Sequence, residues 1–391
     1  MKLMILSLIA SFAFASALPQ LERGSIFAPS GIRMKLVFAL LLCVAFASAQ
    51  FGGFQNAANR FQQGIASLGS RIPSPPTLTN VQNFGDFVTQ SGKTYLNAAD
   101  RRLREGLFSA RKSLVDATNT AFASGASGFE QAVNAFADLT NAEFLKQLTG
   151  LRKSASGEQS AKAHRLSPTV PKGVRVPQSF DWREKGGVTP VKFQGECGSC
   201  WSFATTGAIE GHVFRKTGKL PNLSEQNLID CGKMELGLAG CDGGFQEYAF
   251  NFVQEQNGIA KGDSYPYLDK KDTCKYKSNI SGAQITGFAA IEPKDEATMK
   301  TVVATQGPLA CSVNGLESLL LYKHGIYDDK ECNNGEVNHS VLVVGYGSEK
   351  GKDFWIVKNS WDKAWGEEGY FRLPRGSNFC GIASECSYPI I

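Results

Sequence analysis

The chain has 391 residues, 42% hydrophobic and 20% charged, which leaves room for two or three globular domains. No run of residues approaches the roughly 18 apolar residues of a membrane-spanning helix, so no membrane span is expected. The net charge of +5 conceals two unlike halves: residues 1–175 carry 19 basic and 9 acidic side chains, whereas residues 176–391 carry 22 and 27. The basic charges lie in a leader and a linker rather than on a folded patch, so nucleic acid is not an expected partner. Halves of opposite charge can bind each other, and acid would weaken that binding by protonating carboxylates.

Residues 1–49 contain two segments that are typical of secretory signal peptides. Each begins with Met-Lys-Leu, continues with a short apolar stretch and ends in an A-x-A cleavage pattern, the first at Ala17 and the second at Ala49. The near repeat indicates a duplicated or mispredicted first exon, with Met34 as an alternative start, and we expect cleavage after Ala49. The protein is therefore expected to enter the secretory pathway and to be lysosomal or extracellular.

Composition divides the rest of the chain into four parts. Residues 50–80 are rich in Gly, Gln, Asn, Ser and Pro, which predicts a low-complexity linker. Residues 81–150 begin with apolar side chains at three- and four-residue steps, which predicts a helical domain. Residues 151–175 are basic and contain prolines, so we expect an extended connector that proteases can reach. Residues 176–391 form the last and largest part.

Residues 194–204 read Gln-Gly-Glu-Cys-Gly-Ser-Cys-Trp-Ser-Phe-Ala and contain a candidate nucleophile. Cys200 follows a Gly-Ser turn and begins an apolar-periodic run, so we expect it in the first turn of a helix. Backbone N–H groups and the helix dipole favour a thiolate there and lower the thiol pKa. Cys197 and Cys200 could also form a zinc or redox C-x-x-C pair. That alternative is disfavoured because no second ligand pair, H-x3-5-H pattern or βαβ unit accompanies it, and neither a metal nor a cofactor is expected.

A cysteine nucleophile needs a general base, and the base needs a group that orients it. His339 precedes the apolar run 341–347 and is expected to open a strand. A lone histidine in such a place is more often structural. Asn359 and Trp361 favour the catalytic interpretation, because they supply an amide at the end of the strand that contains residues 355–357, followed by an indole.

These motifs resemble those of papain-like cysteine proteases of the cathepsin L type. Residues 194–204 contain the C-G-S-C-W pattern of those enzymes. Residues 100–119 resemble their helical ERFNIN motif, with Asp for Glu, Arg for Asn and Val for Ile. Residues 132–138 resemble their G-x-N-x-F-x-D motif with Ala for the first Gly, and residues 179–192 resemble the mature amino terminus. The resemblance covers residues 176–391 from end to end.

The resemblance implies an α+β, two-domain papain-like fold, with a helical domain around Cys200, a β-barrel-like domain and a cleft between them. It implies that residues 81–150, called the prosegment below, form a helical inhibitory propeptide. The expected product is a monomeric cysteine endopeptidase that hydrolyses proteins and peptides through a thioester. A catalytically silent protein of the same fold is the alternative, and replacement of Cys200 or His339 would have indicated it. The implied roles are nucleophile for Cys200, acid and base for His339, ring orientation for Asn359, shielding for Trp361 and oxyanion binding for Gln194.

Ten cysteines in an oxidising compartment predict disulfides, and loss of Cys43 with the leader leaves an odd number. The resemblance implies a free Cys200 and the pairs Cys197–Cys241, Cys231–Cys274 and Cys332–Cys380. Cys311 and Cys386 lie outside the usual set, so they form either a fourth bridge or two buried thiols. Asn279 and Asn222 begin glycosylation sequons, and Asn279 is the one expected to be exposed.

The resemblance also implies a substrate site. Gly243 and Gly244 would pair with an extended substrate, and Trp365 would floor the leaving-group side. The pocket for the second residue before the scissile bond (S2) would be lined by Phe245, Gln246, Ser312, Val337, Ser340 and Glu385. Cathepsin L has a small apolar residue where this chain has Glu385, so we expect acceptance of Arg as well as bulky apolar residues, unless the carboxylate turns into solvent. No long insertion or histidine pair follows Gly244, which favours an endopeptidase with an open cleft.

Overall fold

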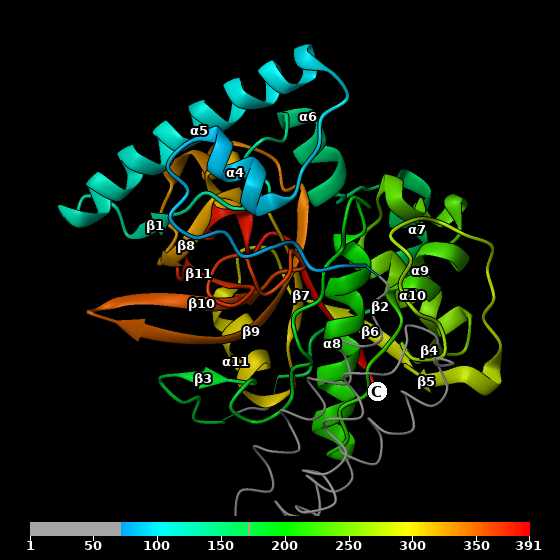
Figure 1. Ribbon diagram of the computed structural model, residues 1–391. Coiled ribbons are helices and arrows are strands. Elements are labelled where there is room, and N and C mark those ends of the chain that lie inside the picture. Colours follow the sequence, from blue (N-terminus) through cyan, green and yellow to red (C-terminus); the bar gives the residue numbers. More distant parts are fainter. Residues whose placement is uncertain (1–71, 171–172) are drawn as a thin grey trace, which may run out of the picture. The chain divides into compact units, whose positions relative to one another are not determined.

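The computed structural model describes residues 72–170 and 173–391, so both signal-peptide-like segments and most of the linker at 50–80 lie outside the described residues. Figure 1 shows a mixed α and β structure, in which the prosegment lies against the C-terminal domain of residues 176–391. The prosegment and connector comprise α4 (Phe84–Ser91), α5 (Ala98–Ala123), β1 (Phe129–Gln131), α6 (Asn141–Glu143), a π-helical turn (Phe144–Leu148), α7 (Ala155–His164) and β2 (Arg165–Leu166).

The C-terminal domain combines five helices with ten strands. The helices are α8 (Cys200–Thr217), α9 (Glu225–Cys231), α10 (Gln246–Glu255), α11 (Glu296–Thr305) and α12 (Glu317–Leu320). The strands are β3 (Phe180–Asp181), β4 (Ile259–Ala260), β5 (Ser281–Ala283), β6 (Gly287–Ala290), β7 (Leu309–Val313), β8 (Tyr322–Gly325), β9 (His339–Glu349), β10 (Lys352–Lys358), β11 (Tyr370–Pro374) and β12 (Cys386–Ile390).

One eight-stranded sheet organises the domain. Its strand order is β11-β10-β9-β7-β12-β6-β2, with β3 also paired to β9, and every pairing is antiparallel except β2 with β6. Helix α8 lies between this sheet and helices α9 and α10 (Figure 1). One apolar core joins these helices to the sheet, and a second lies on the β-rich side. The predicted α+β fold, with a helical part around Cys200 and a β-rich part that carries His339, is confirmed.

Helix α8 begins at Cys200, as the sequence predicts. It ends at Thr217, where Gly218 adopts a left-handed conformation (φ 71°) and donates its N–H to the Phe214 carbonyl. Arg215 and Lys216 occupy the last turn, where positive charge is favourable to the helix dipole. These groups stabilise the negative, C-terminal end of the helix. The nucleophile candidate, Cys200, lies at its positive, N-terminal end.

The prosegment has a small core of its own. Phe84, Phe87, Phe108 and Val115 pack together across α4 and α5. Strand β1 extends this unit onto the C-terminal domain by pairing with β8 in antiparallel register.

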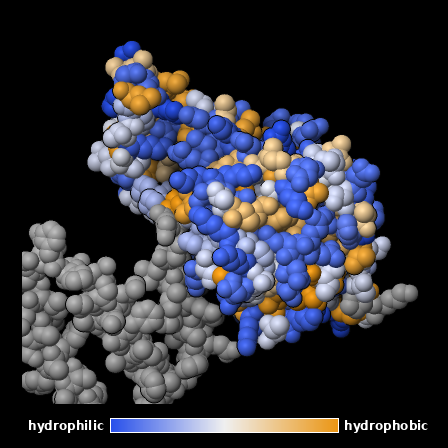
Figure 2. Space-filling model, turned by 90° about the vertical axis from the view of Figure 1, so that its right-hand side faces the viewer, coloured by the Kyte–Doolittle hydropathy of each residue, from blue (hydrophilic) through white to orange (hydrophobic). Residues whose placement is uncertain are grey.

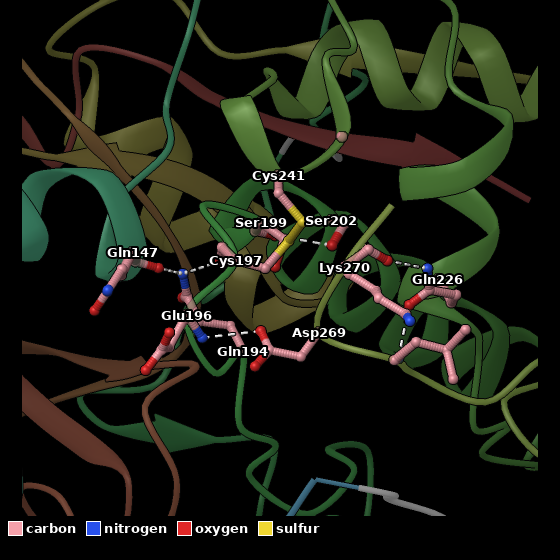
Figure 3. Close-up of a disulfide and its surroundings, with 12 residues drawn as sticks. Gln147, Gln194, Glu196, Cys197, Ser199, Ser202, Gln226, Cys241, Asp269 and Lys270 are labelled. Atoms are coloured by element: carbon pink, nitrogen blue, oxygen red, sulfur yellow. Dashed lines mark hydrogen bonds between the residues drawn. A yellow bond between two sulfur atoms is a disulfide. The ribbon is translucent and has the colours of Figure 1, made fainter. Parts of the chain in front are cut away.

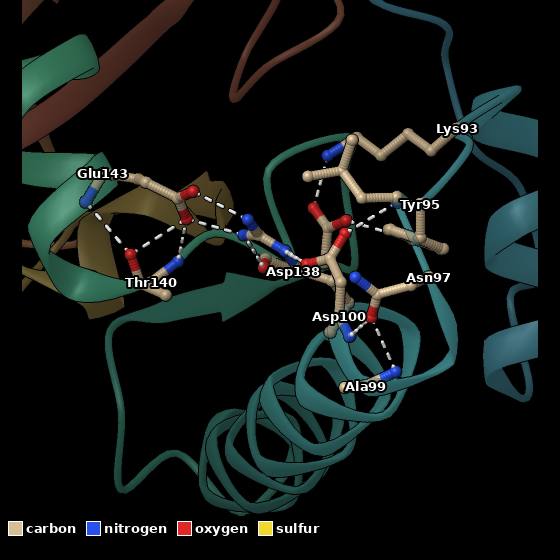
Figure 4. A network of polar contacts seen from close by, with 10 residues as sticks. Lys93, Tyr95, Asn97, Ala99, Asp100, Asp138, Thr140 and Glu143 are labelled. Atoms are coloured by element: carbon tan, nitrogen blue, oxygen red, sulfur yellow. Dashed lines mark hydrogen bonds and ion pairs between the residues drawn. The ribbon is translucent and has the colours of Figure 1, made fainter.

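Figure 4 shows the polar network that joins α5 to the chain before α6. Arg104 donates two hydrogen bonds, of 2.6 and 2.7 Å, to the carboxylate of Glu143. Lys93 and Tyr95 both bind the carboxylate of Asp138, which is buried. The pairing of charged groups with each other allows these side chains to be partly buried in the prosegment.

The expectation of a wholly extended connector was wrong, because residues 155–164 form α7. Ser154 caps the helix by accepting the Gly157 N–H, and Ala161 is fully buried against α10. Arg165, which follows α7, forms an ion pair with the buried Glu247. Small residues on one face let α7 approach α10 closely, and this tertiary packing stabilises a helix that a polar sequence alone did not predict.

Apolar side chains on the visible surface occur in small groups. On the face shown in Figure 2, hydrophilic residues cover most of the area and hydrophobic residues are scattered among them. In the part of the chain that the structure describes, no helix is long and apolar enough to cross a membrane.

Candidate active site

Cys200 is completely buried at the start of α8. Its sulfur accepts a hydrogen bond of 3.4 Å from the N–H of Ser340. Burial raises the pKa of the Cys200 thiol to about 12, although this N–H and others act to lower it. The expected low thiol pKa was therefore wrong for this state, because removal from water outweighs the donors at the helix terminus.

His339 opens β9, and Asn359 directly follows β10, as predicted. The imidazole Nε2 lies 2.8 Å from the Asn359 Oδ1, and that oxygen also accepts the Ser360 N–H at 2.8 Å. Because an amide oxygen can only accept, Nε2 carries the ring proton and Nδ1 keeps its lone pair. Nδ1 is buried and has no hydrogen-bond partner. Burial lowers the pKa of His339 to about 4, so a ring with a free basic nitrogen persists at neutral pH.

Trp361 lies against this pair of residues. Its ring is nearly parallel to that of His339, with centroids 4.9 Å apart, and it is fully buried. Trp365 packs edge-on against Trp361 and donates its indole N–H to the Leu320 carbonyl at 2.9 Å. The indole next to the imidazole is thus that of Trp361, with Trp365 behind it.

The side-chain amide of Gln194 is held in one orientation. Its Nε2 donates to the carbonyl oxygens of Gln147 in the prosegment, at 2.9 Å, and of Cys197, at 3.0 Å. Its Oε1 accepts the Ser360 hydroxyl at 2.6 Å. Figure 3 shows Gln147 beside Gln194, next to the Cys197–Cys241 disulfide. Sequence reasoning missed Ser360, although its place between Asn359 and Trp361 could have indicated it.

The end of the prosegment pairs with Gly244. The Gly244 N–H donates to the Gly150 carbonyl at 3.0 Å, and the Arg152 N–H donates to the Gly244 carbonyl at 2.8 Å, in parallel orientation. A side chain at Gly150 would clash with the Gly198 carbonyl, and one at Gly243 would approach the Gly150 carbonyl. The two segments can lie this close because Gly150, Gly243 and Gly244 have no side chains.

Glu385 faces a pocket that the connector enters. Lys153 forms an ion pair with Glu385 Oε1, and its ammonium lies 5.3 Å from the centroid of the Phe245 ring. Val337, which is half-buried, lines the same pocket. Only 15% of the Glu385 side chain is exposed, so the carboxylate does not turn into solvent.

A buried polar network backs this pocket. Gln246 donates to the Ser312 hydroxyl at 3.1 Å and to the Glu385 carbonyl at 3.2 Å, and it accepts the Ser340 hydroxyl at 3.0 Å. Gln246 and Ser312 are fully buried, and Ser340 is nearly so. Of the six residues predicted for the S2 pocket, Val337 and Glu385 line this pocket and Phe245 contacts Lys153 within it, whereas Gln246, Ser312 and Ser340 form the network behind it.

Four disulfides occur among the described residues, and Cys200 is the free cysteine there. Cys311 and Cys386 form the fourth bridge, rather than two thiols, and join directly opposite residues of β7 and β12. Asn279 is exposed, whereas Asn222 is half-buried. The disulfides pair Cys197 with Cys241, Cys231 with Cys274, Cys311 with Cys386 and Cys332 with Cys380.

Comparison with known proteins identifies the same two parts, a propeptide domain and a protease domain. Residues 176–390 match the papain family cysteine protease model, and residues 84–144 match the cathepsin propeptide inhibitor domain (I29). A cathepsin L-like peptidase of Aedes aegypti is 41% identical over 79% of this chain and 93% of its own length. Procathepsin L of Rattus norvegicus is 42% identical over 74% of this chain and 86% of its own length.

Solved structures agree with these matches. Digestive procathepsin L 3 from the larval midgut of Tenebrio molitor superimposes with a TM-score of 0.72 at 37% identity, over 78% of this chain and 97% of its own. Family membership therefore explains three features together: the buried cysteine at a helix terminus, the paired histidine and asparagine, and the attached I29 domain. The chain belongs to the papain family of cysteine proteases and is a cathepsin L-like zymogen that carries its own propeptide inhibitor domain.

Proposed function

We propose that Cys200, His339, Asn359 and Gln194 are the catalytic residues of this cysteine protease. Cys200 Sγ attacks the peptide carbonyl carbon, and His339 takes the thiol proton on Nδ1. His339 then gives that proton to the leaving amine, and a thioester remains on Cys200. Water hydrolyses the thioester, releasing the acid product and restoring the thiol.

Asn359 and Gln194 support these steps in different ways. Asn359 fixes the imidazole so that Nδ1 is the free nitrogen. Gln194 and the N–H of Cys200 donate to the oxyanion of the tetrahedral intermediate. The observation that carries this proposal is the contact between the Gln194 amide and the Gln147 carbonyl. A main-chain carbonyl of the inhibitor occupies the donor that a substrate oxyanion would need.

The S2 pocket is proposed to accept Arg as well as bulky apolar side chains. Phe245 and Val337 offer apolar walls, and the ion pair between Lys153 and Glu385 supports the acceptance of a basic side chain. Lys153 binds one carboxylate oxygen, whereas Glu385 Oε2 is buried and has no hydrogen-bond partner. A guanidinium presents two parallel N–H donors and could satisfy both oxygens, which favours Arg over Lys.

The remaining proposals concern the protein as a whole. The absence of a long insertion after Gly244 favours an endopeptidase. Four disulfides fit a secretory route to a lysosome or to the exterior. We propose a monomer, with a glycan at the exposed Asn279; Asn222 is a weaker candidate because it is half-buried.

The test begins with the purified precursor, acidified in the presence of thiol. Sequencing of the new amino terminus is expected to place it near Val176, and Cys200→Ala is expected to abolish processing and peptide cleavage. The product is then assayed on peptides that differ only in Arg, Leu or Phe at the second position before the scissile bond. An active Cys200→Ala enzyme would refute the assignment.

Glu385→Ala tests the acidic pocket. The ratio of kcat/KM for Arg and Leu peptides is expected to fall at least about tenfold, equivalent to about 1.4 kcal/mol, because the partner of the guanidinium is lost. Glu336→Ala is the matched control, since Glu336 is an exposed carboxylate lining the same pocket. An unchanged ratio in Glu385→Ala would show that this carboxylate does not select substrates.

A further inference from the structure

We propose that the Cys311–Cys386 disulfide positions Glu385 in the S2 pocket, so that acceptance of Arg depends on this bridge. The inference rests on the proposed function of Glu385 and adds a positioning role for two cysteines that do not contact substrate.

The bridge lies directly beside two pocket residues. Glu385 immediately precedes Cys386, the first residue of β12, and Ser312 immediately follows Cys311 in β7. Cys311 and Cys386 face each other across the two strands, with Cα atoms 4.2 Å apart. A covalent link at this point therefore fixes the distance between two walls of the pocket.

On the side of β7, few contacts hold this end of β12, whereas on its other side the Cys386 carbonyl accepts the Ile291 N–H at 2.8 Å. Its ladder with β7 consists of two residue pairs, Cys386 with Cys311 and Ser387 with Ala310. Glu385 lies beyond that ladder, and its carbonyl is held by the Gln246 amide at 3.2 Å. A two-pair ladder opens easily, so β12 can separate from β7 at this point, and the disulfide prevents that separation.

The other end of the same short segment is also anchored. Cys380 is bridged to Cys332, so residues 380–386 are closed by a disulfide at each end. Cys380 has a left-handed backbone (φ 50°), and its N–H is held by Asn333 at 2.8 Å. With the Cys311–Cys386 bridge in place, the segment that carries Glu385 cannot shift as a unit.

A displacement of Glu385 would affect charged and apolar substrates differently. A guanidinium binds a carboxylate through directed hydrogen bonds of about 2.7–2.9 Å, which a shift of about 1 Å breaks. An apolar side chain gains from removal of surface from water, which has no direction. Loss of the bridge should therefore weaken selection of Arg at the second position before the scissile bond, while cleavage of peptides with Leu at that position stays nearly intact.

The bridge should survive the thiol used in activation assays. Cys311 is fully buried and Cys386 is 1% exposed, so a reductant does not reach the sulfurs in the folded enzyme. The wild-type assay therefore reports on the bridged pocket.

The experiment compares two bridge-free variants, C311A/C386A and C311V/C386A, the second of which better fills the volume of the sulfurs. Both should fold, because β7 keeps five residue pairs with β9, and β12 keeps four with β6. C231A/C274A is the control, since it removes a bridge at the end of α9, away from the pocket residues. Each precursor is acid-activated, and kcat/KM is measured on Arg and Leu peptides together with the melting temperature.

The expected result is a fall of at least about fivefold in the Arg-to-Leu ratio of both bridge-free variants, with the Leu value within about twofold of wild type. The control should melt at a lower temperature than wild type, with an unchanged Arg-to-Leu ratio of kcat/KM. An unchanged ratio in bridge-free enzyme, an equal loss on both peptides, or failure of both variants to fold would overturn the inference. If Glu385→Ala also leaves the ratio unchanged, the proposed acidic pocket fails as well; if it lowers the ratio, the pocket stands and the positioning role alone is wrong.

Discussion

The side-chain amide of Gln194 and the carbonyl of Gln147 are joined by a hydrogen bond of 2.9 Å. One group belongs to the catalytic domain and the other to its inhibitor. The Trp361 indole N–H makes a similar contact, at 2.8 Å, with the carbonyl of Leu148. The prosegment thus uses main-chain carbonyls to occupy donors around Cys200, and its inhibition depends on a close backbone approach.

Replacement of Gly150 with Ala should weaken this inhibition. The new methyl group would clash with the Gly198 carbonyl, and φ of 136° at Gly150 is strained for any residue with a side chain. We expect the variant precursor to convert faster at pH 5, by at least about tenfold if the clash costs 1.4 kcal/mol or more. Gly106→Ala is the control, because a methyl group there meets no atom within 4 Å. Equal conversion rates for Gly150→Ala and wild type would contradict the close-approach model.

Ser360 should affect catalysis through Gln194. Its hydroxyl binds the Gln194 Oε1 at 2.6 Å and keeps the amide nitrogen directed at the oxyanion position. Ser360→Ala is expected to lower kcat about tenfold with little change in KM, less than the 10²–10³-fold loss expected for Gln194→Ala. Ser387→Ala provides the comparison, since that buried hydroxyl has no hydrogen-bond partner. A Ser360→Ala enzyme with wild-type kcat would show that Ser360 does not support catalysis.

Alkylation should report the state of Cys200. With the thiol pKa raised to about 12 by burial, the precursor holds almost no thiolate at pH 7.5. Iodoacetamide is expected to modify the activated enzyme at least about 100-fold faster than the precursor, measured by intact mass after timed exposure. Cys200→Ser should show no modification in either form, because the other cysteines of residues 173–391 are in disulfides. Rapid labelling of the intact precursor would show that the prosegment does not shield the thiol.

The Arg104–Glu143 pair should persist at the pH of activation. Hydrogen bonds from Arg104 lower the pKa of Glu143 to about 2, so the pair contributes stability above the ordinary carboxyl pKa. That contribution is lost only as the pH falls toward 2. Glu143→Gln should therefore speed precursor conversion at pH 5, measured by gel electrophoresis over time. Asp116→Asn, which removes an exposed pair with Lys112 on α5, should have little effect. If Glu143→Gln matched wild type at pH 5, the pair would have no role in retaining the prosegment.

His212 should make the enzyme less stable in acid. Burial lowers its pKa to about 3, so the unfolded chain binds more protons than the folded one between pH 6.5 and 3. Stability therefore falls as the pH drops below 6.5, by about 2 kcal/mol at pH 5 relative to pH 7.5. His212→Gln should remove this part of the pH dependence in guanidinium unfolding, with Cys200→Ala in both proteins to prevent autolysis. An identical pH dependence with and without His212 would contradict the burial argument.

The sequence by itself determined which elements carry the candidate catalytic residues. A Gly-Ser turn before an apolar-periodic run places Cys200 at a helix start, and the apolar runs around His339 and Asn359 place both residues at strand ends. These features follow from local periodicity and turn chemistry, which act over a few residues. The resemblance to cathepsin L precursors then supplied the expected domain order and three disulfide pairs.

Only the tertiary structure decided the features that depend on distant segments. It folded the connector into α7, because α10 supplies the surface against which Ala161 packs. It raised the thiol pKa where the helix terminus alone predicts a lower one, because burial depends on the whole assembly. It joined Cys311 to Cys386 and brought Lys153 to Glu385, at sequence separations of 75 and 232 residues. No local pattern encodes such pairings, since strand register and packing set them after the chain has folded.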